Sequence, residues 1–102
     1  MPLPETVDDF IAAKIKEWSP TDYNGLLRFV YDRWAHGYGK IRLNGVTLEF
    51  VTGGWSDNEF ILGAMRETFF WRNFWESSHR GGMVVFEISE SLAAALADLI
   101  TA

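Results

Sequence analysis

Apolar residues recur along this chain with two different spacings, and the longer spacing predicts helices. Apolar residues recur every three or four positions over 6–18 and again over 20–37, which is the spacing of a helix with one buried face. Thr6 and Asp9, three residues apart, resemble a capping box, so the first helix is expected to begin at Thr6. Ser19 is the expected N-cap of the second, with Pro20 at its first position, where a missing N–H costs nothing. Gly37 is expected to end that helix in the left-handed conformation.

The shorter spacing, in which apolar and polar residues alternate, predicts strands. Residues 40–51 read as a β-hairpin, because Ile41 and Leu43 alternate with polar neighbours before Asn44-Gly45, the strongest two-residue turn signal. A return strand then ends before Thr52. Residues 83–88 form a third predicted strand.

A long third helix is expected between these strands. Ser56-Asp57-Asn58-Glu59 matches the S-x-x-E capping box, so the helix should begin at Ser56 and run to about Ser77. Residues 78–82 end it. A last helix, capped by Ser89 or Ser91, closes the chain.

The element order α-α-β-β-α-β-α indicates a small α+β fold in one domain, residues 1–102. We expect a three-stranded sheet, containing the hairpin with turn Asn44-Gly45, packed against helices on one face. The pattern leaves open whether the third strand pairs parallel or antiparallel.

Composition narrows the possible functions. Of the 102 residues, 16% are aromatic, enough to build a dense core in a short chain. The net charge of −5 argues against direct nucleic-acid binding, which needs a basic face. It leaves open a basic protein partner, although acidity also serves solubility alone. The chain has no Cys, no apolar run of membrane-spanning length and no signal-peptide pattern at its start, so we expect a cytoplasmic protein without disulfides.

The most informative segment is Thr52-Gly53-Gly54-Trp55-Ser56-Asp57-Asn58-Glu59. It predicts a strand, two glycines and a helix start, and free N–H groups at a helix start bind anions. Gly53 and Gly54 would let a ligand approach the backbone. The alternative is a tight turn whose free donors are already capped by Ser56 and Glu59. The candidate binding residues here are Gly53, Gly54, Trp55, Ser56 and Asn58.

Further candidates lie on and after the third helix. Helical spacing places Phe70 among polar residues, so it could form a contact patch, and places Arg72 toward the apolar side. Arg72 could pair with Glu76 at i,i+4, or it could be partly buried and hold an anionic group. Arg80, Gly81 and Gly82 could belong to a binding loop, although a helix C-terminus explains them equally well.

No catalytic centre is visible in the sequence. His36 lies in a run of aromatics and glycines, residues 34–40, that could form a stacking surface, but no Ser or Cys nucleophile is organised around it. His36 and His79 match no metal-ligand spacing. We therefore expect no catalytic residues, no metal and no cofactor.

Several of these motifs together resemble a group of small uncharacterised proteins encoded mainly in bacteriophage genomes. The shared features are Tyr31-Asp32-Arg33-Trp34, the segment from Thr52 to Glu59, the aromatic pairs Phe70-Trp71 and Phe74-Trp75, and Ser78-x-Arg80-Gly81-Gly82, covering roughly residues 20 to 88. The resemblance implies a phage accessory gene, and such genes often encode proteins that block host machinery, including immune systems. It implies no established activity.

The sequence therefore leads to three hypotheses. The first is a binding protein that inhibits or modulates a host protein in the host cytoplasm. The second is a binder of an anionic small molecule such as a nucleotide, in which Gly53–Trp55 and Arg80–Gly82 share one pocket. The two ends of a helix of 20 residues lie about 30 Å apart, so this sharing would require oligomerisation. The third, an enzyme, has the least support.

Overall fold

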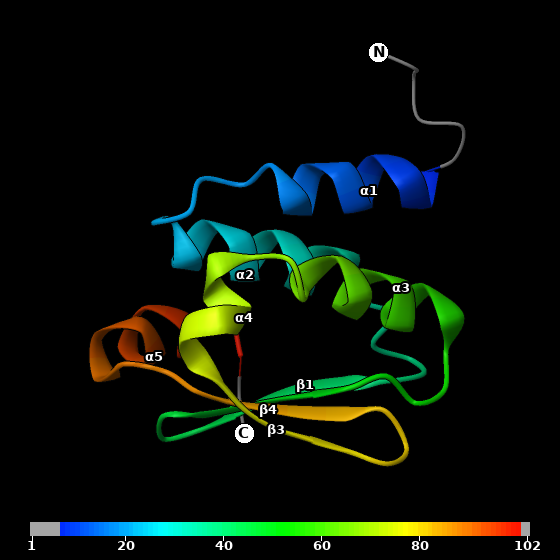
Figure 1. Ribbon diagram of the computed structural model, residues 1–102. Coiled ribbons are helices and arrows are strands. Elements are labelled where there is room, and N and C mark those ends of the chain that lie inside the picture. The colour runs from blue at the N-terminus through cyan, green and yellow to red at the C-terminus, as the bar shows by residue number, and fades with distance from the viewer. Residues whose placement is uncertain (1–6, 101–102) are drawn as a thin grey trace.

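The computed structural model describes residues 7–100 and has the order α-α-β-β-α-α-β-β-α. The chain forms α1 (Val7–Lys16), α2 (Tyr23–Arg33), β1 (Lys40–Asn44), β2 (Thr47–Val51), α3 (Ser56–Met65), α4 (Phe69–Phe74), β3 (Trp75–His79), β4 (Met83–Glu87) and α5 (Glu90–Leu96). All helices lie on one side of the sheet, with α1 outermost (Figure 1). The α+β class and the one-sided helices are confirmed.

The sheet has four strands, not the expected three, in the order β1-β2-β4-β3 with every pair antiparallel. The strand that sequence analysis missed is β3. Its composition, Trp-Glu-Ser-Ser-His, has no apolar alternation, and four of its five residues are exposed. It is a strand because it pairs with β4, with a register shift between Trp75 and Ser77.

The predicted hairpin is confirmed, with its turn moved by one residue. Asn44 pairs with Thr47, so the two loop residues are Gly45 and Val46. Gly45 has φ 63°, and no described residue other than glycine has a positive φ. A positive φ at the first loop position alone is the pattern of a type II′ turn, which needs glycine there.

The expected boundaries of the second helix are wrong at both ends. Asp22, not Ser19, caps α2, because its carboxylate accepts a hydrogen bond from Gly25 N at 3.0 Å. The helix ends at Arg33, well before Gly37. The proposed cap of the first helix at Thr6 lies outside the described residues.

The single long third helix is also wrong, because it is broken after Met65. Thr68 has an extended backbone and is the N-cap of α4. Its Oγ1 donates a hydrogen bond to Met65 O at 2.7 Å and accepts one from Trp71 N at 3.2 Å. The helix does begin at Ser56, but Trp55 is its N-cap and no side chain caps it. Ser56-x-x-Glu59 is therefore not a capping box here. At the last helix, Ser89 Oγ accepts from Leu92 N, as expected.

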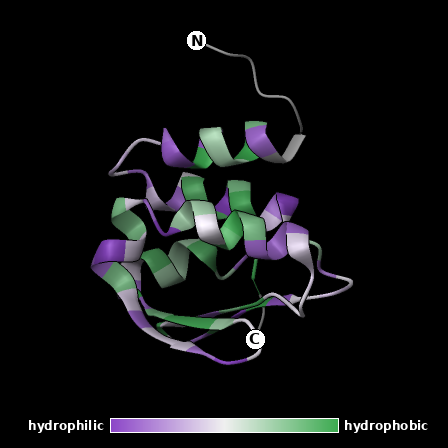
Figure 2. Cartoon of the chain, turned by 45° about the vertical axis from the view of Figure 1, so that its right-hand side comes forward, coloured by the Kyte–Doolittle hydropathy of each residue, from purple (hydrophilic) through white to green (hydrophobic). Residues whose placement is uncertain are grey.

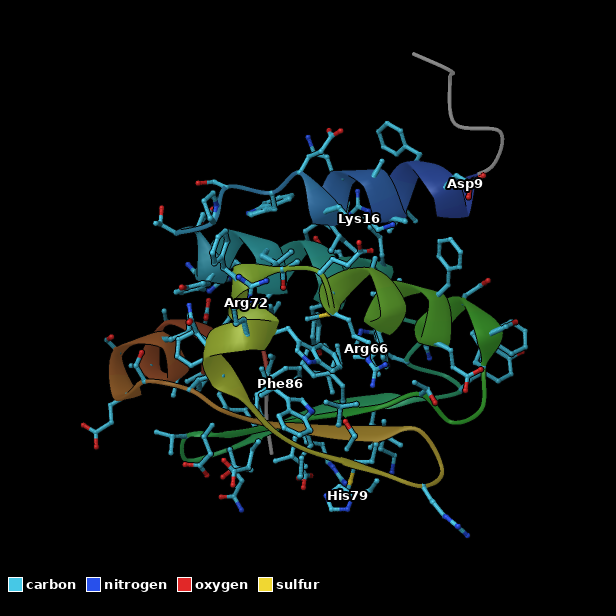
Figure 3. The ribbon with its side chains drawn as sticks, in the orientation of Figure 1. Asp9, Lys16, Arg66, Arg72, His79 and Phe86 are labelled. Atoms are coloured by element: carbon cyan, nitrogen blue, oxygen red, sulfur yellow. The ribbon has the colours of Figure 1, made fainter. Side chains whose placement is uncertain are left out.

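The core is an aromatic cluster between the sheet and the helices. Phe86 of β4 lies at its centre, with ring centroids of Phe70, Trp71 and Phe50 at 4.8, 5.3 and 5.5 Å (Figure 3). Hydrophobic residues line the space between helices and sheet, while polar residues dominate the outside (Figure 2). Burying each such ring contributes on the order of 2 kcal/mol.

Candidate functional site

Three loops meet at one end of the sheet: residues 34–39 before β1, residues 52–55 after β2, and residues 80–82 between β3 and β4. Thr52 N donates a hydrogen bond to Gly82 O at 3.0 Å, and Gly54 N donates to Thr52 Oγ1 at 3.3 Å. The two glycine pairs of the sequence are thus neighbours within one chain. The expected 30 Å separation is wrong, because the helix ends early and the chain returns to this end of the sheet as β3.

Asn58 ties two of these loops together. Its side chain is fully buried, and Oδ1 accepts from Ala35 N at 2.8 Å while Nδ2 donates to Ala35 O and Thr52 O at 3.2 Å each. Its amide is fully committed to backbone partners. Asn58 was a candidate binding residue, but in this structure it positions the loops and does not face a ligand.

Two glycines allow these loops to touch. Gly53 has φ 66°, and a Cβ there would overlap the carbonyl oxygen of Tyr38. A Cβ on Gly39 would overlap Val51 O. Gly54, Gly81 and Gly82 also have positive φ, at 74°, 86° and 81°. The glycines therefore set the loop shape, and Gly53 is required both for conformation and for space.

The loops present an exposed pair of stacked rings. Tyr38 and Trp55 lie with centroids 4.0 Å apart and planes only 4° from parallel. Tyr38 is 62% exposed and Trp55 37%. The carbonyl of Tyr38 packs against Gly53, and the hydrogen bonds of Asn58 to Ala35 and Thr52 hold together the two loops that carry the rings.

Acidic side chains lie beside this pair, in the first turn of α3. Asp57 and Glu59 are both exposed, and neither forms an ion pair with any residue in 7–100. Acidic groups at a helix N-terminus are stabilised by the helix dipole, which accounts for their position without a ligand. Their effect on a partner is to favour positive charge.

A groove of about 310 Å³ continues from the loops, running between α3 and the β3–β4 hairpin. Its apolar lining includes Leu62, Trp71 and Met83, and its charged lining is Glu59 and Arg66. The Arg66 guanidinium lies 5.3 Å from the Trp71 ring centroid. Figure 3 shows Arg66 pointing from α3 toward the sheet.

The two candidates on the predicted third helix have other surroundings than expected. Phe70 is 1% exposed and belongs to the core, so it is not a contact residue. The error follows from the helix break, which rotates α4 relative to the predicted helix. Arg72 is exposed, lies 5.5 Å from the Phe69 ring centroid, and forms no ion pair among the described residues. It does not pair with Glu76, and its exposure contradicts the alternative of a partly buried arginine.

The remaining candidates lie at the three loops. Trp55 and Ser56 are exposed, and Ser56 forms no cap. Arg80 is exposed at the β3–β4 turn next to Gly81 and Gly82. Of the ten candidate residues, the structure brings together Gly53, Gly54, Trp55, Ser56, Asn58, Gly81 and Gly82, with Arg80 at the rim.

Neither histidine forms a catalytic arrangement. His36 Nε2 lies 2.8 Å from Tyr31 O, and His79 Nε2 lies 2.9 Å from Ser77 Oγ, both on exposed residues. A Ser–His pair works as a nucleophile when a third group orients the ring and donors stabilise the oxyanion. Within residues 7–100 no such third group bonds to His79.

Two other classes of site were searched for over the described part of the chain. No cluster of three or more potential metal ligands occurs there. None of the helices there is long and apolar enough to cross a bilayer.

Comparisons with known proteins give no match: no protein-family model fits the sequence, and no curated protein or solved structure is significantly similar to it.

Sequence analysis identified the glycine-rich loops but missed Glu59 and Arg66 as groove residues. Their signal was the spacing 59, 63 and 66, which places three residues on one side of a helix. Recognising it required knowing that β3 lies opposite that side.

Proposed function

We propose that this chain is a small accessory binding protein of the bacteriophage type, which inhibits or modulates a host protein, such as a defence-system component, in the host cytoplasm. The observation that supports this most is the exposed Tyr38–Trp55 stack on loops fixed by Asn58 and Gly53. A structure organised around presenting two aromatic rings is suited to recognition.

The choice of a protein partner follows from the chemistry of the rings. Trp and Tyr are enriched among the residues that dominate binding energy at protein interfaces. They contribute large contact areas at a small cost in conformational entropy. Here that cost is lower still, because Tyr38 and Trp55 already restrain each other.

The charge of the surroundings favours a basic partner surface. Asp57 lies two residues from Trp55 and has no cationic partner in 7–100, and the chain carries a net charge of −5. An Arg or Lys side chain could lie over the outer ring face and approach Asp57. We therefore expect association to weaken as salt is raised.

The test is affinity capture from bacterial host lysate with wild type and the variants Trp55→Ala and Tyr38→Ala, read by mass spectrometry. We expect one host protein to be captured by wild type and lost with either variant, a reduction of about tenfold or more in retained partner. Trp75→Ala and Phe10→Ala are the matched controls, since Trp75 and Phe10 are 47% and 56% exposed elsewhere on the molecule.

A host protein retained equally by Trp55→Ala and Tyr38→Ala would contradict the assignment of this surface. Equal loss in all four variants would point to nonspecific hydrophobic capture instead. Thermal unfolding of each variant, followed by calorimetry, should stay cooperative with a midpoint close to wild type, because all four side chains are exposed.

A second candidate, binding of an anionic small molecule such as a nucleotide, gains support from the contact between Thr52 and Gly82. The two glycine turns can now contribute to one site in a monomer, and the first turn of α3 has no side-chain cap. Asp57 and Glu59 oppose an anion there. A thermal-shift screen with nucleotides tests this candidate, and the absence of any stabilisation would exclude it.

A further inference from the structure

The groove under α3 contains two charges of opposite sign that do not meet. Glu59 and Arg66 both line it, and neither side chain forms an ion pair or hydrogen bond with the side chains described, residues 9–100, or with the backbone of 7–100. Lys16, Arg28 and Arg42, by contrast, all have carboxylate partners. A ligand with a positive and a negative end would complement both charges.

Glycine separates the two charges. Gly63 lies four residues after Glu59 and three before Arg66, on the same side of α3, and also lines the groove. A Cβ at Gly63 would meet no atom within 4 Å. Glycine in a helix interior costs about 1 kcal/mol relative to alanine, and here it leaves the space between the charges open.

The spacing of the two residues along the helix axis indicates the length of the ligand. Glu59 lies in the first turn of α3 and Arg66 is its C-cap in helical conformation, so their Cα atoms lie about 10 Å apart along the axis. An extended chain of three residues spans about 10 Å. Single amino acids are too short to reach both side chains without bending them toward each other.

The groove also determines what lies between the ends of the ligand. Leu62, Trp71 and Met83 provide an apolar wall and floor. A central aliphatic side chain would bury surface there, and the volume of about 310 Å³ is at the lower end of the range for small-ligand sites.

We infer that this groove binds a short extended peptide of about three residues, with its ammonium end at Glu59, its carboxylate end at Arg66 and an apolar side chain in the middle. The occupant we infer is a free tripeptide, whose own terminal ammonium and carboxylate groups supply the two charges. The groove adjoins the loops that carry Tyr38 and Trp55, but neither ring lines it, so the inference does not depend on the proposed function.

The experiment is an NMR titration of ¹⁵N-labelled protein with the tripeptide Ala-Leu-Ala. We expect saturable shifts at Gly63, Arg66 and Met83. N-acetylation or C-amidation of the peptide should each weaken binding about fivefold, because each removes one charge interaction at a partly exposed site.

Variants connect each end of the peptide to one residue. Glu59→Gln should no longer distinguish free from acetylated peptide, and Arg66→Gln should no longer distinguish acid from amide. Matched controls are Glu90→Gln, another acidic residue in a first helical turn, and Arg72→Gln, another arginine close to an aromatic ring. Both controls should bind like wild type.

Gly63→Leu separates folding from binding. This variant should raise the melting temperature, because leucine is the better helix former, and should abolish peptide shifts by filling the groove. Trp55→Ala and Tyr38→Ala should leave peptide binding unchanged, so failure of the partner-protein proposal and failure of this one are distinguishable.

Three results would overturn the inference: shifts that never saturate, equal binding of free and doubly capped Ala-Leu-Ala, or equal weakening by the Arg72→Gln and Arg66→Gln variants. A fully capped Lys-Leu-Asp peptide that binds more tightly than free Ala-Leu-Ala would also contradict the free tripeptide as occupant, because side chains and not chain ends would then supply the charges.

Discussion

At the scale of single residues, the glycines in the loops differ in what they tolerate. Gly53 combines a left-handed conformation with direct contact to the carbonyl of Tyr38. Gly54 is left-handed but has open space around it, and Gly37 has open space and no positive φ. Glycine is therefore required for conformation and space at Gly53, for conformation alone at Gly54, and for neither at Gly37.

Substitution by alanine should separate these purposes. We expect Gly53→Ala to lower the free energy of unfolding by more than about 3 kcal/mol, since it adds a steric overlap to the conformational strain. Gly54→Ala should cost about 1 to 2 kcal/mol from conformation alone. Gly37→Ala should stay within about 0.5 kcal/mol of wild type. Urea denaturation measures all three, and equal costs at Gly53 and Gly54 would refute the contact with Tyr38.

The types of residue along the sequence predicted the glycine turn of this site, but not the burial of Phe70 or the role of Asn58. The glycines at 53 and 54 were recognisable because a strand before them and a helix after them require a turn. Phe70 was misplaced, because its burial depends on where α4 begins. Asn58 was recognised as a candidate for binding, but its role in joining the loops had no local signal, since its three hydrogen bonds are to backbone groups 6 and 23 positions away.

At the scale of elements, the error over 56–77 has one cause. The apolar spacing predicted one helix, but the Thr68 hydroxyl donates to the Met65 carbonyl at the end of α3 and accepts from Trp71 N in the first turn of α4, which makes a break inexpensive. Beyond it, 75–79 is a strand only through pairing with β4. Local pattern cannot report a strand that has no buried face of its own.

Helix caps provide a test at this scale. Ser89→Ala should lower stability by about 1 kcal/mol, because it removes the acceptor for Leu92 N. Ser56→Ala should change stability by no more than about 0.5 kcal/mol, since its side chain caps nothing. Thermal unfolding of the two variants measures both changes in stability. A larger loss of stability for Ser56→Ala than for Ser89→Ala would show that Ser56 does form a capping box.

At the scale of the whole molecule, the two-layer arrangement was predictable and the meeting of the loops was not. The hairpin, the last helix and the one-sided packing follow from local patterns and from the need to bury one face of each element. The contact between residues 52 and 82 depends on the strand order β1-β2-β4-β3, which brings β2 and β4 together.

Long-range charge contacts give this fold a measurable response to acid. Arg28 of α2 donates to Asp98, after α5, at 2.9 Å, and this hydrogen bond holds the pKa of the exposed Asp98 carboxyl below its ordinary value. A group whose pKa is lower in the folded state stabilises the protein at pH values above its unfolded-state pKa. This stabilisation is lost as the pH falls through the folded-state pKa. Wild type should therefore exceed Asp98→Asn in stability near neutral pH, and the gap should close below about pH 4.

Urea denaturation at several pH values measures this gap. Asp32→Asn, on an exposed part of α2, is the control and should follow the wild-type profile. A gap that persists unchanged into acid would mean that Asp98 acts through something other than its charge.

The parallel rings of Tyr38 and Trp55 give the protein a built-in optical signal. Two ring chromophores 4.0 Å apart couple their electronic transitions, so we expect a band in the far-ultraviolet circular dichroism that both Trp55→Ala and Tyr38→Ala lack. Anything that inserts between or tilts the rings would reduce that band without unfolding the chain. The molecule can thus be monitored unlabelled, at the surface where we expect its partner to bind.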